Sequence, residues 1–249
     1  MYDFFDEDKR LASKSGSIEF LTTIKYVKRY LKDSDNILDL GAGTGIYSIY
    51  FNNLGHEITA VELVEKHCNI IKEKSENSIK VVNSDALSYI KTLSDASMDI
   101  IFCFGPIYHM ESYDKRMELL RECKRVVKEN GKIFISIINN DMVNITETFV
   151  YKGPKHLRDN SLFKEGFTLK NMPFVFHTID EFKEMLLNSK LKLLKIIAQD
   201  GIMELVTKKI NAFTEDEFNA WLKYHFYICE KPEMQGISNH NLFICEKGK

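Results

Sequence analysis

Five apolar runs alternate with amphipathic segments between residues 37 and 138 of this chain. The fourth run, MDIIFCF at residues 98–104, is apolar almost throughout. A strand that is covered on both faces has this composition, whereas a strand with one solvated face alternates polar and apolar residues. Strands that alternate with helices in this way favour a parallel sheet with helices packed on both of its faces. The first part of the chain is therefore predicted to be a doubly wound α/β structure.

Two further apolar runs, at residues 191–199 and 241–247, extend the predicted sheet to seven strands. The connection between them lacks an ordinary crossover, so we expect the last strand to run antiparallel to the others. The whole chain, residues 1–249, is predicted to form a single α/β domain around this mostly parallel sheet.

Two segments are predicted to lie outside the sheet. Apolar side chains recur at helical spacing over residues 17–31, and we expect residues 1–31 to form a helical cover. Residues 141–177 contain glycines and prolines among aromatic residues and are predicted to form an inserted cap or lid. Its aromatic residues either line a pocket or fill the core of the cap, and the sequence leaves both interpretations open.

Composition excludes several classes of function. The net charge is −2, so no overall basic field favours nucleic acid as a partner. The five cysteines form no C-x-x-C pair, and we expect neither a metal site nor a disulfide framework. The chain starts with acidic and polar residues, unlike a signal peptide, and no apolar run approaches the roughly 20 residues that span a bilayer. These features predict a cytoplasmic protein that does not bind membranes; the oligomeric state stays open.

A glycine-rich turn follows the first strand, residues 37–40, and contains Gly41, Gly43 and Gly45. A turn of this kind lets a ligand lie against bare backbone, and the helix that follows adds N–H groups near the ligand. The dinucleotide fingerprint G-x-G-x-x-G would need glycine at position 46, where this chain has Ile46. A phosphate-binding P-loop would need a lysine here, and the turn has none. The spacing therefore indicates a nucleotide-like cofactor other than a dinucleotide or a triphosphate.

The segment from Asp39 to Gly45, DLGAGTG, resembles the first motif of the class I S-adenosylmethionine-dependent methyltransferases. The segment GPIYH at residues 105–109 resembles the type 11, or UbiE-like, group of small bacterial methyltransferases, and this likeness extends over nearly the whole chain. The resemblance implies a Rossmann-like fold, S-adenosylmethionine as cofactor and a methyltransferase reaction. The cofactor has a carboxylate and no phosphate, which suits a glycine turn without lysine.

Residues at the ends of the other strands fit the same cofactor. Glu62 ends the second strand, where a carboxylate can accept hydrogen bonds from ribose hydroxyls. The resemblance places Asp85 and Ala86 near the adenine ring and Phe104 near the methyl end. An N-terminal arginine, Arg10, is a candidate partner of the cofactor carboxylate. The complete set of expected cofactor-binding residues is Arg10, Asp39, Gly41, Ala42, Gly43, Glu62, Leu63, Asp85, Ala86 and Phe104.

The acceptor of the methyl group is not encoded in a recognisable motif. Methyl transfer from a sulfonium is an in-line displacement, so the protein mainly aligns the reactants and excludes water. The resemblance favours a small-molecule acceptor; an RNA or protein acceptor, and a protein that binds the cofactor without turnover, are the alternatives. His109 and His240 are the candidate catalytic residues, because each follows or precedes a strand at the expected ligand edge and can exchange a proton near neutral pH.

Overall fold

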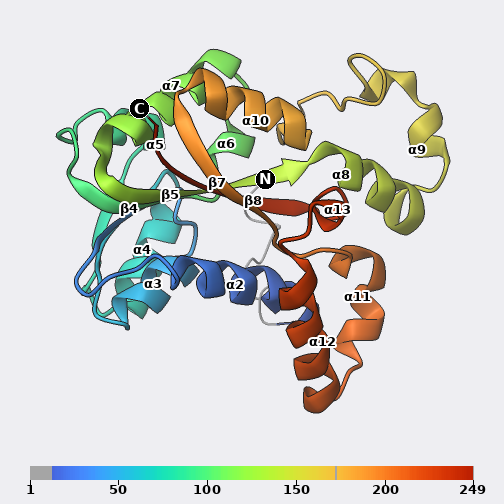
Figure 1. The fold of residues 1–249 in the computed structure, drawn as a ribbon, viewed down its shortest axis with the longest axis horizontal. Helices are drawn as coiled ribbons and strands as arrows, with labels where there is room; N and C mark the ends of the chain where they lie inside the picture. Colours follow the sequence, from blue (N-terminus) through green and yellow to red (C-terminus); the bar gives the residue numbers. More distant parts are fainter. Residues whose placement is uncertain (1–12, 172, 249) are drawn as a thin grey trace. The chain divides into compact units, whose positions relative to one another are not determined.

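Eight strands form one sheet in the described part of the chain, which comprises residues 13–171 and 173–248 of the computed structural model (Figure 1). Seven of them follow the order β3-β2-β1-β4-β5-β8-β7, and a short eighth strand, β6, pairs with β5. The strands are β1 Asn36–Leu40, β2 Glu57–Glu62, β3 Lys80–Asn83, β4 Met98–Cys103, β5 Val127–Asn139, β6 Phe176–His177, β7 Leu191–Ala198 and β8 His240–Lys247. The predicted seven-stranded Rossmann-like α/β sheet is confirmed, with β6 as an addition.

The strand directions also agree with the prediction. β1 pairs in parallel with β2 and β4, β2 with β3, and β4 with β5. β8 runs the other way: the Asn139 amide at the end of β5 donates to the Asn239 carbonyl just before β8. The opposite ends of these two strands are joined by the ion pair between Lys132 and Glu246. The last strand is therefore antiparallel to β5.

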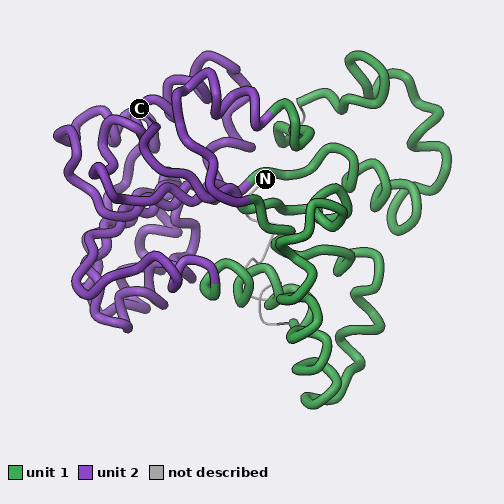
Figure 2. The backbone as a smooth tube through the Cα atoms, viewed as in Figure 1, with its two compact units in different colours: residues 1–25, 137–181, 196–242 green, residues 26–136, 182–195, 243–249 purple. Residues whose placement is uncertain are grey.

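The chain divides into two compact units (Figure 2). Unit 1 comprises residues 1–25, 137–181 and 196–242, and unit 2 comprises residues 26–136, 182–195 and 243–249. Strands β5, β7 and β8 contribute residues to both units.

Unit 2 contains the parallel part of the sheet with helices on both faces. Figure 1 shows α3 and α4 on one face and α7 and α10 on the other. The helices are α3 Ile46–Asn52, α4 Glu65–Lys74, α5 Ala86–Ile90, α6 Pro106–His109, α7 Tyr113–Val126 and α10 Ile179–Asn188, the last of which begins in unit 1. Phe102 on β4 and Phe134 on β5 are fully buried, as expected for strands that are covered on both faces.

Helix α7 ends at Val126, although the amphipathic segment DKRMELLRECKRVVKEN, which predicts a helix, extends to residue 130. Val127 already has an extended backbone and pairs with Met98, and the pairing of β4 with β5 then skips to Ile100 and Lys132. The residues in between form an irregularity in β5. A Cβ at Gly131 would lie 2.5 Å from the Asp99 carbonyl oxygen, so contact with β4 ends the helix early.

Unit 1 is mainly helical. Most of α2, Lys14–Val27, belongs to it, and α2 ends four residues before the predicted end at residue 31. The remaining helical segments are α8 Asn140–Thr146, the π-helix η2 Glu147–Tyr151, α9 Lys155–Arg158, the 3-10 helix η3 Asn160–Leu162, α11 Met203–Asn211, α12 Glu215–Ile228 and α13 Pro232–Gln235. Ile18 of α2, Met203 and Ile210 of α11 and Phe218 of α12 form a buried apolar cluster.

A buried hydrogen bond joins α2 to α12 within unit 1. The Thr22 hydroxyl lies 3.0 Å from the His225 Nε2 atom, and both side chains are buried. Burial lowers the pKa of His225 to about 4, because a charged imidazole would lose its hydration. Among the described residues, no helix has the length and apolar composition needed to cross a membrane.

Candidate functional site

The three glycines of the turn between β1 and α3 differ in what surrounds them. All three have positive φ, at +71° for Gly41, +56° for Gly43 and +85° for Gly45. A Cβ at Gly41 would lie 2.9 Å from Cδ of Pro106, and one at Gly45 would lie 2.7 Å from Cγ1 of Ile71. A Cβ at Gly43 would meet no atom within 4 Å. Gly41 and Gly45 are therefore required for packing within the fold, whereas Gly43 borders open space.

The Glu62 carboxylate holds this turn in place. One oxygen accepts a hydrogen bond from the Gly43 amide over 2.8 Å, and the other accepts from the Val64 amide over 2.9 Å. Nδ1 of His67 lies 3.7 Å from the same carboxylate. Each carboxylate oxygen can accept a second hydrogen bond, so these contacts do not exhaust its capacity.

Asp39 lies behind the turn. Its side chain is 2% exposed and accepts a hydrogen bond of 2.6 Å from the Ser48 hydroxyl of α3. Burial raises the pKa of Asp39 to about 7; the Ser48 hydrogen bond opposes this shift, and the charge of Glu62 adds to it. The observed hydrogen bond between Asp39 and Ser48 therefore joins β1 to α3. Direct contact of Asp39 with a cofactor stays a prediction.

The ends of β2 and β3 are joined by a side-chain amide. Nδ2 of Asn83 donates to the carbonyl oxygens of Glu62 and Leu63, over 3.0 and 2.9 Å. The Leu63 side chain, just after β2, is 66% exposed. The Asp85 carboxylate caps α5 by accepting from the Ser88 amide over 2.9 Å.

The segment after β4 brings a histidine to the glycine turn. Phe104 stacks on Phe102 with a ring-centroid distance of 5.0 Å. A Cβ at Gly105 would lie 3.6 Å from the Gly41 carbonyl oxygen and 3.8 Å from Cδ2 of His109. His109 is exposed and ends the short helix α6. It therefore lies on the same side of unit 2 as the turn.

One residue that supports this segment was not identified from the sequence. Arg116 of α7 is 6% exposed, and its guanidinium donates to the carbonyl oxygens of Met110 and Glu111 over 2.6 and 2.8 Å. These bonds anchor the chain immediately after His109. The available signal was a charged residue among the buried positions of a helix, next to Leu119 and Leu120.

The structure thus gathers nearly all the expected cofactor residues at one edge of unit 2. Gly41, Ala42 and Gly43 follow β1, Glu62 ends β2 and Leu63 follows it, Asp85 and Ala86 follow β3, and Phe104 follows β4. This edge is where ligands bind in open parallel sheets. Arg10 lies outside the described residues. The roles of all these residues in binding a cofactor stay predictions.

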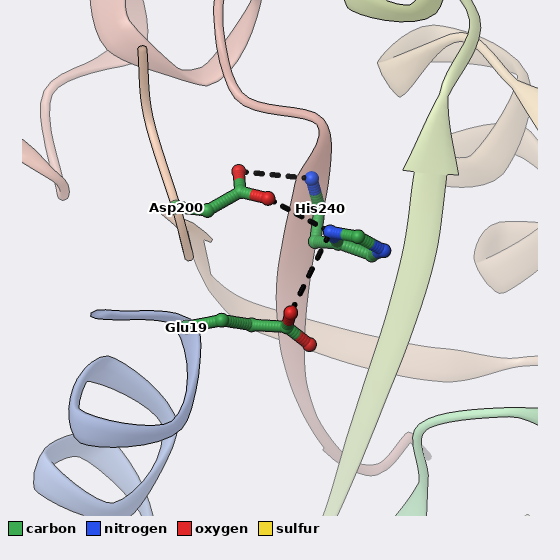
Figure 3. Close-up of side chains that lie close together, drawn as sticks. All are labelled: Glu19, Asp200 and His240. Atoms are coloured by element: carbon green, nitrogen blue, oxygen red, sulfur yellow. Dashed lines mark hydrogen bonds and ion pairs between the residues drawn. The ribbon is translucent and has the colours of Figure 1, made fainter. Parts of the chain in front are cut away.

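His240 belongs to unit 1, where two acidic residues surround it (Figure 3). Its Nδ1 atom lies 2.8 Å from Oδ2 of Asp200 and 3.8 Å from Oε2 of Glu19. Burial would raise the pKa of Asp200, but its hydrogen bonds to His240 and Ser238 and the charge of His240 outweigh burial and lower that pKa. Asp200 was not among the site residues predicted from the sequence. It follows a strand, as Asp85 does, so the search for acidic residues at strand ends could have found it.

Comparisons with known proteins agree with this arrangement. Residues 38–135, which span the glycine turn and the strands up to β5, match the family model described as a methyltransferase domain. A ubiquinone biosynthesis O-methyltransferase from Idiomarina loihiensis is 27% identical over 43% of this chain and 43% of its own length. A ribosomal protein L11 methyltransferase from Thermotoga neapolitana is 26% identical over 59% of this chain and 53% of its own length. The chain thus spans about half the length of these curated relatives.

A solved structure shares the fold over a greater length. The crystal structure of a SAM-dependent methyltransferase from Archaeoglobus fulgidus superposes with a TM-score of 0.63 and covers 99% of this chain and 100% of its own. The two sequences are 19% identical, so this likeness is one of fold.

Proposed function

We propose that this chain, which is a class I S-adenosylmethionine-dependent methyltransferase by its domain match and its fold, transfers a methyl group to a small-molecule acceptor. S-adenosylmethionine supplies the activated methyl group when it is bound. The observation that carries the proposal is Gly43: its backbone borders open space just after β1, with no atom within 4 Å of the position that a Cβ would take.

The residues around Gly43 fit this cofactor. Glu62 has acceptor capacity beyond its two backbone contacts, which suits ribose hydroxyls. The exposed Leu63 side chain gives an apolar surface beside it for a flat ring. Asp85 lies exposed after the neighbouring strand and can accept from an amino group. The turn offers no lysine, in keeping with a ligand that lacks phosphate.

His109 is the proposed proton acceptor in this unit. It is exposed and lies in a segment that Arg116 anchors, and its Cδ2 atom approaches Gly105, which lies beside the Gly41 carbonyl oxygen. An imidazole can take a proton from an acceptor hydroxyl or amine near neutral pH. A catalytic role for His240, in unit 1, stays a prediction.

The class of acceptor is inferred from charge and from the relatives. The chain carries a net charge of −2, which disfavours a polyanion such as RNA. One relative is named for a step in ubiquinone biosynthesis and another for a ribosomal protein, so a protein acceptor is the second candidate.

Titration calorimetry tests cofactor binding. S-adenosylmethionine and its demethylated product should bind at micromolar order, and NAD and ATP should not compete. Tight binding of NAD would contradict the proposal.

Methyl-labelled cofactor tests the acceptor. We would incubate the protein with this cofactor and, in separate reactions, a metabolite extract, bulk RNA and ribosomal protein. Label in the metabolite fraction is expected, and label confined to RNA or protein would overturn the small-molecule acceptor. The variant His109→Gln should bind cofactor normally and slow labelling at least about a hundredfold, the lower end of the range for a lost proton acceptor, whereas His56→Gln should label as wild type. Equal labelling by His109→Gln would exclude His109 as the proton acceptor.

A further inference from the structure

Three side chains in unit 1 converge from distant parts of the sequence (Figure 3). Glu19 comes from α2, Asp200 follows β7, and His240 begins β8. One Oε of Glu19, one Oδ of Asp200 and one ring nitrogen of His240 all lie within 4.8 Å of one another. All three residues are partly buried.

The spacing of these atoms suits a shared metal ion. Oxygen and nitrogen ligands bind Zn²⁺ at about 2.0–2.2 Å, which places neighbouring ligand atoms of a tetrahedral site roughly 3.4 Å apart. In this structure Nδ1 of His240 lies 2.8 Å from Asp200 and 3.8 Å from Glu19. Shifts of less than about 1 Å would bring these pairs to ligand spacing.

The two carboxylates beside His240 lie at unequal distances from its Nδ1 atom. Both carboxylates approach the same nitrogen, which can carry a single proton. That proton can form one short hydrogen bond, and the structure gives it to Asp200. The Glu19 oxygen faces the same point at a longer distance. A divalent cation between the three groups would be coordinated by both carboxylates at once.

Asp200 is also held in position by its surroundings, as metal ligands commonly are. Its Oδ1 atom accepts from the His240 amide over 3.1 Å and from the Ser238 hydroxyl over 2.6 Å. Ser238 is fully buried, and its oxygen also accepts from the Gly201 amide over 2.8 Å. These contacts fix the carboxylate so that Oδ2 faces the imidazole.

We infer that Glu19, Asp200 and His240 bind one divalent transition-metal ion. The imidazole distinguishes this group from a purely acidic cluster, because nitrogen ligands favour Zn²⁺ and its neighbours over Mg²⁺ and Ca²⁺. The order of affinity should be Zn²⁺ above Mn²⁺, with Mg²⁺ weakest. Sequence spacing could not reveal this site, since its ligands lie at positions 19, 200 and 240. None of the five cysteines belongs to this group.

Calorimetry with Zn²⁺ and electron paramagnetic resonance with Mn²⁺ test the inference on the full chain without methyl acceptor. Wild type should bind one ion of each metal. Glu19→Gln, Asp200→Asn and His240→Gln should each lower the Zn²⁺ affinity at least tenfold. Glu233→Gln and His56→Gln, which replace an acid and a histidine elsewhere, should bind as wild type. Binding should also raise the midpoint of thermal unfolding in wild type.

The inference fails if wild type shows no saturable binding at millimolar metal, or if any of the three ligand variants binds as tightly as wild type. Asp200→Asn alters contacts that support its loop, so its circular dichroism spectrum must match wild type before it is used. Glu19→Gln, checked by the same spectrum, keeps the test decisive if Asp200→Asn misfolds. The readout is metal binding, so failure here leaves the proposed methyl transfer untouched.

Discussion

The Glu62 carboxylate accepts a hydrogen bond from the Gly43 amide over 2.8 Å, and this contact joins the end of β2 to the turn after β1. The residue that we expect to receive the ribose hydroxyls therefore also fixes the backbone against which the cofactor would lie. Binding and local stability are coupled at this residue. A substitution at Glu62 should change both, and the two effects can be separated by measurement.

We expect Glu62→Gln to weaken S-adenosylmethionine binding and to lower the free energy of unfolding, each by about 1–3 kcal/mol, the scale of a lost hydrogen bond to a charged group. The glutamine side-chain oxygen can accept a hydrogen bond from one of the two backbone N–H groups. Its NH₂ group is a donor and would face the other N–H group, so that hydrogen bond is lost. Calorimetry and urea unfolding measure the two effects. Glu57→Gln, an exposed change on the same strand, should alter neither. Full cofactor affinity in Glu62→Gln would show that Glu62 is not the ribose partner.

Gly43→Val should abolish cofactor binding while the chain still folds. The added side chain would meet no protein atom within 4 Å, but it would occupy the space above the turn. Its positive φ should cost about 1–2 kcal/mol of stability. Gly55→Val is a matched control, because Gly55 also has positive φ and open surroundings, at the far end of α3. Gly55→Val should lose similar stability and keep cofactor affinity; unchanged binding in Gly43→Val would mean that the cofactor lies elsewhere.

The parallel part of the sheet was predictable because its signals are local. The runs 37–40 and 98–104 are each apolar except for one aspartate, and the glycines between Asp39 and Ile46 mark the first turn unambiguously. The end of α7 was not predictable, because residues 127–130 continue the amphipathic segment without a glycine or proline. Their contact with Asp99 of β4 decides the outcome, and such a contact does not appear in the local sequence.

The site was partly predictable for the same reason. Glu62 ends a strand and Asp85 follows one, both at the expected edge, and that rule alone places them. The backbone contacts of Glu62 and the burial of Asp39 depend on how β1, β2 and α3 pack together, so the sequence could not supply them. The group of Glu19, Asp200 and His240 is assembled from three separate segments, and no spacing rule connects them.

His225 should make the fold sensitive to acid. Burial lowers its pKa to about 4, whereas an unfolded histidine titrates near 6.5. The unfolded chain therefore binds a proton that the folded chain resists, and stability falls as the pH decreases through this window. We expect a loss of roughly 2 kcal/mol between pH 7 and pH 5 from this residue. Urea unfolding of wild type and His225→Gln should show that the substitution removes this part of the pH dependence; parallel curves would contradict the assignment.

Asp39 should make the fold less stable as the pH rises, which is the opposite of the effect of His225. Burial raises its folded-state pKa to about 7, above the unfolded value of 3.8. The folded chain therefore holds a proton on Asp39 that the unfolded chain releases. The resulting stability is fully present below the unfolded pKa and is lost as the pH rises through the folded pKa. Between pH 6 and pH 8 the wild type should lose roughly 1 kcal/mol from this residue.

The variant Asp39→Asn measures this contribution directly. Asparagine stays neutral, and its side-chain oxygen can still accept the hydrogen bond from the Ser48 hydroxyl. The stability of the variant relative to wild type should therefore increase between pH 6 and pH 8 in urea unfolding without cofactor. Ser48→Ala removes the donor that favours the charged carboxylate, so it should move the wild-type transition to still higher pH. If the difference between wild type and Asp39→Asn stayed constant across this range, Asp39 would already be charged in the folded chain, and its burial would have to be balanced by a cation.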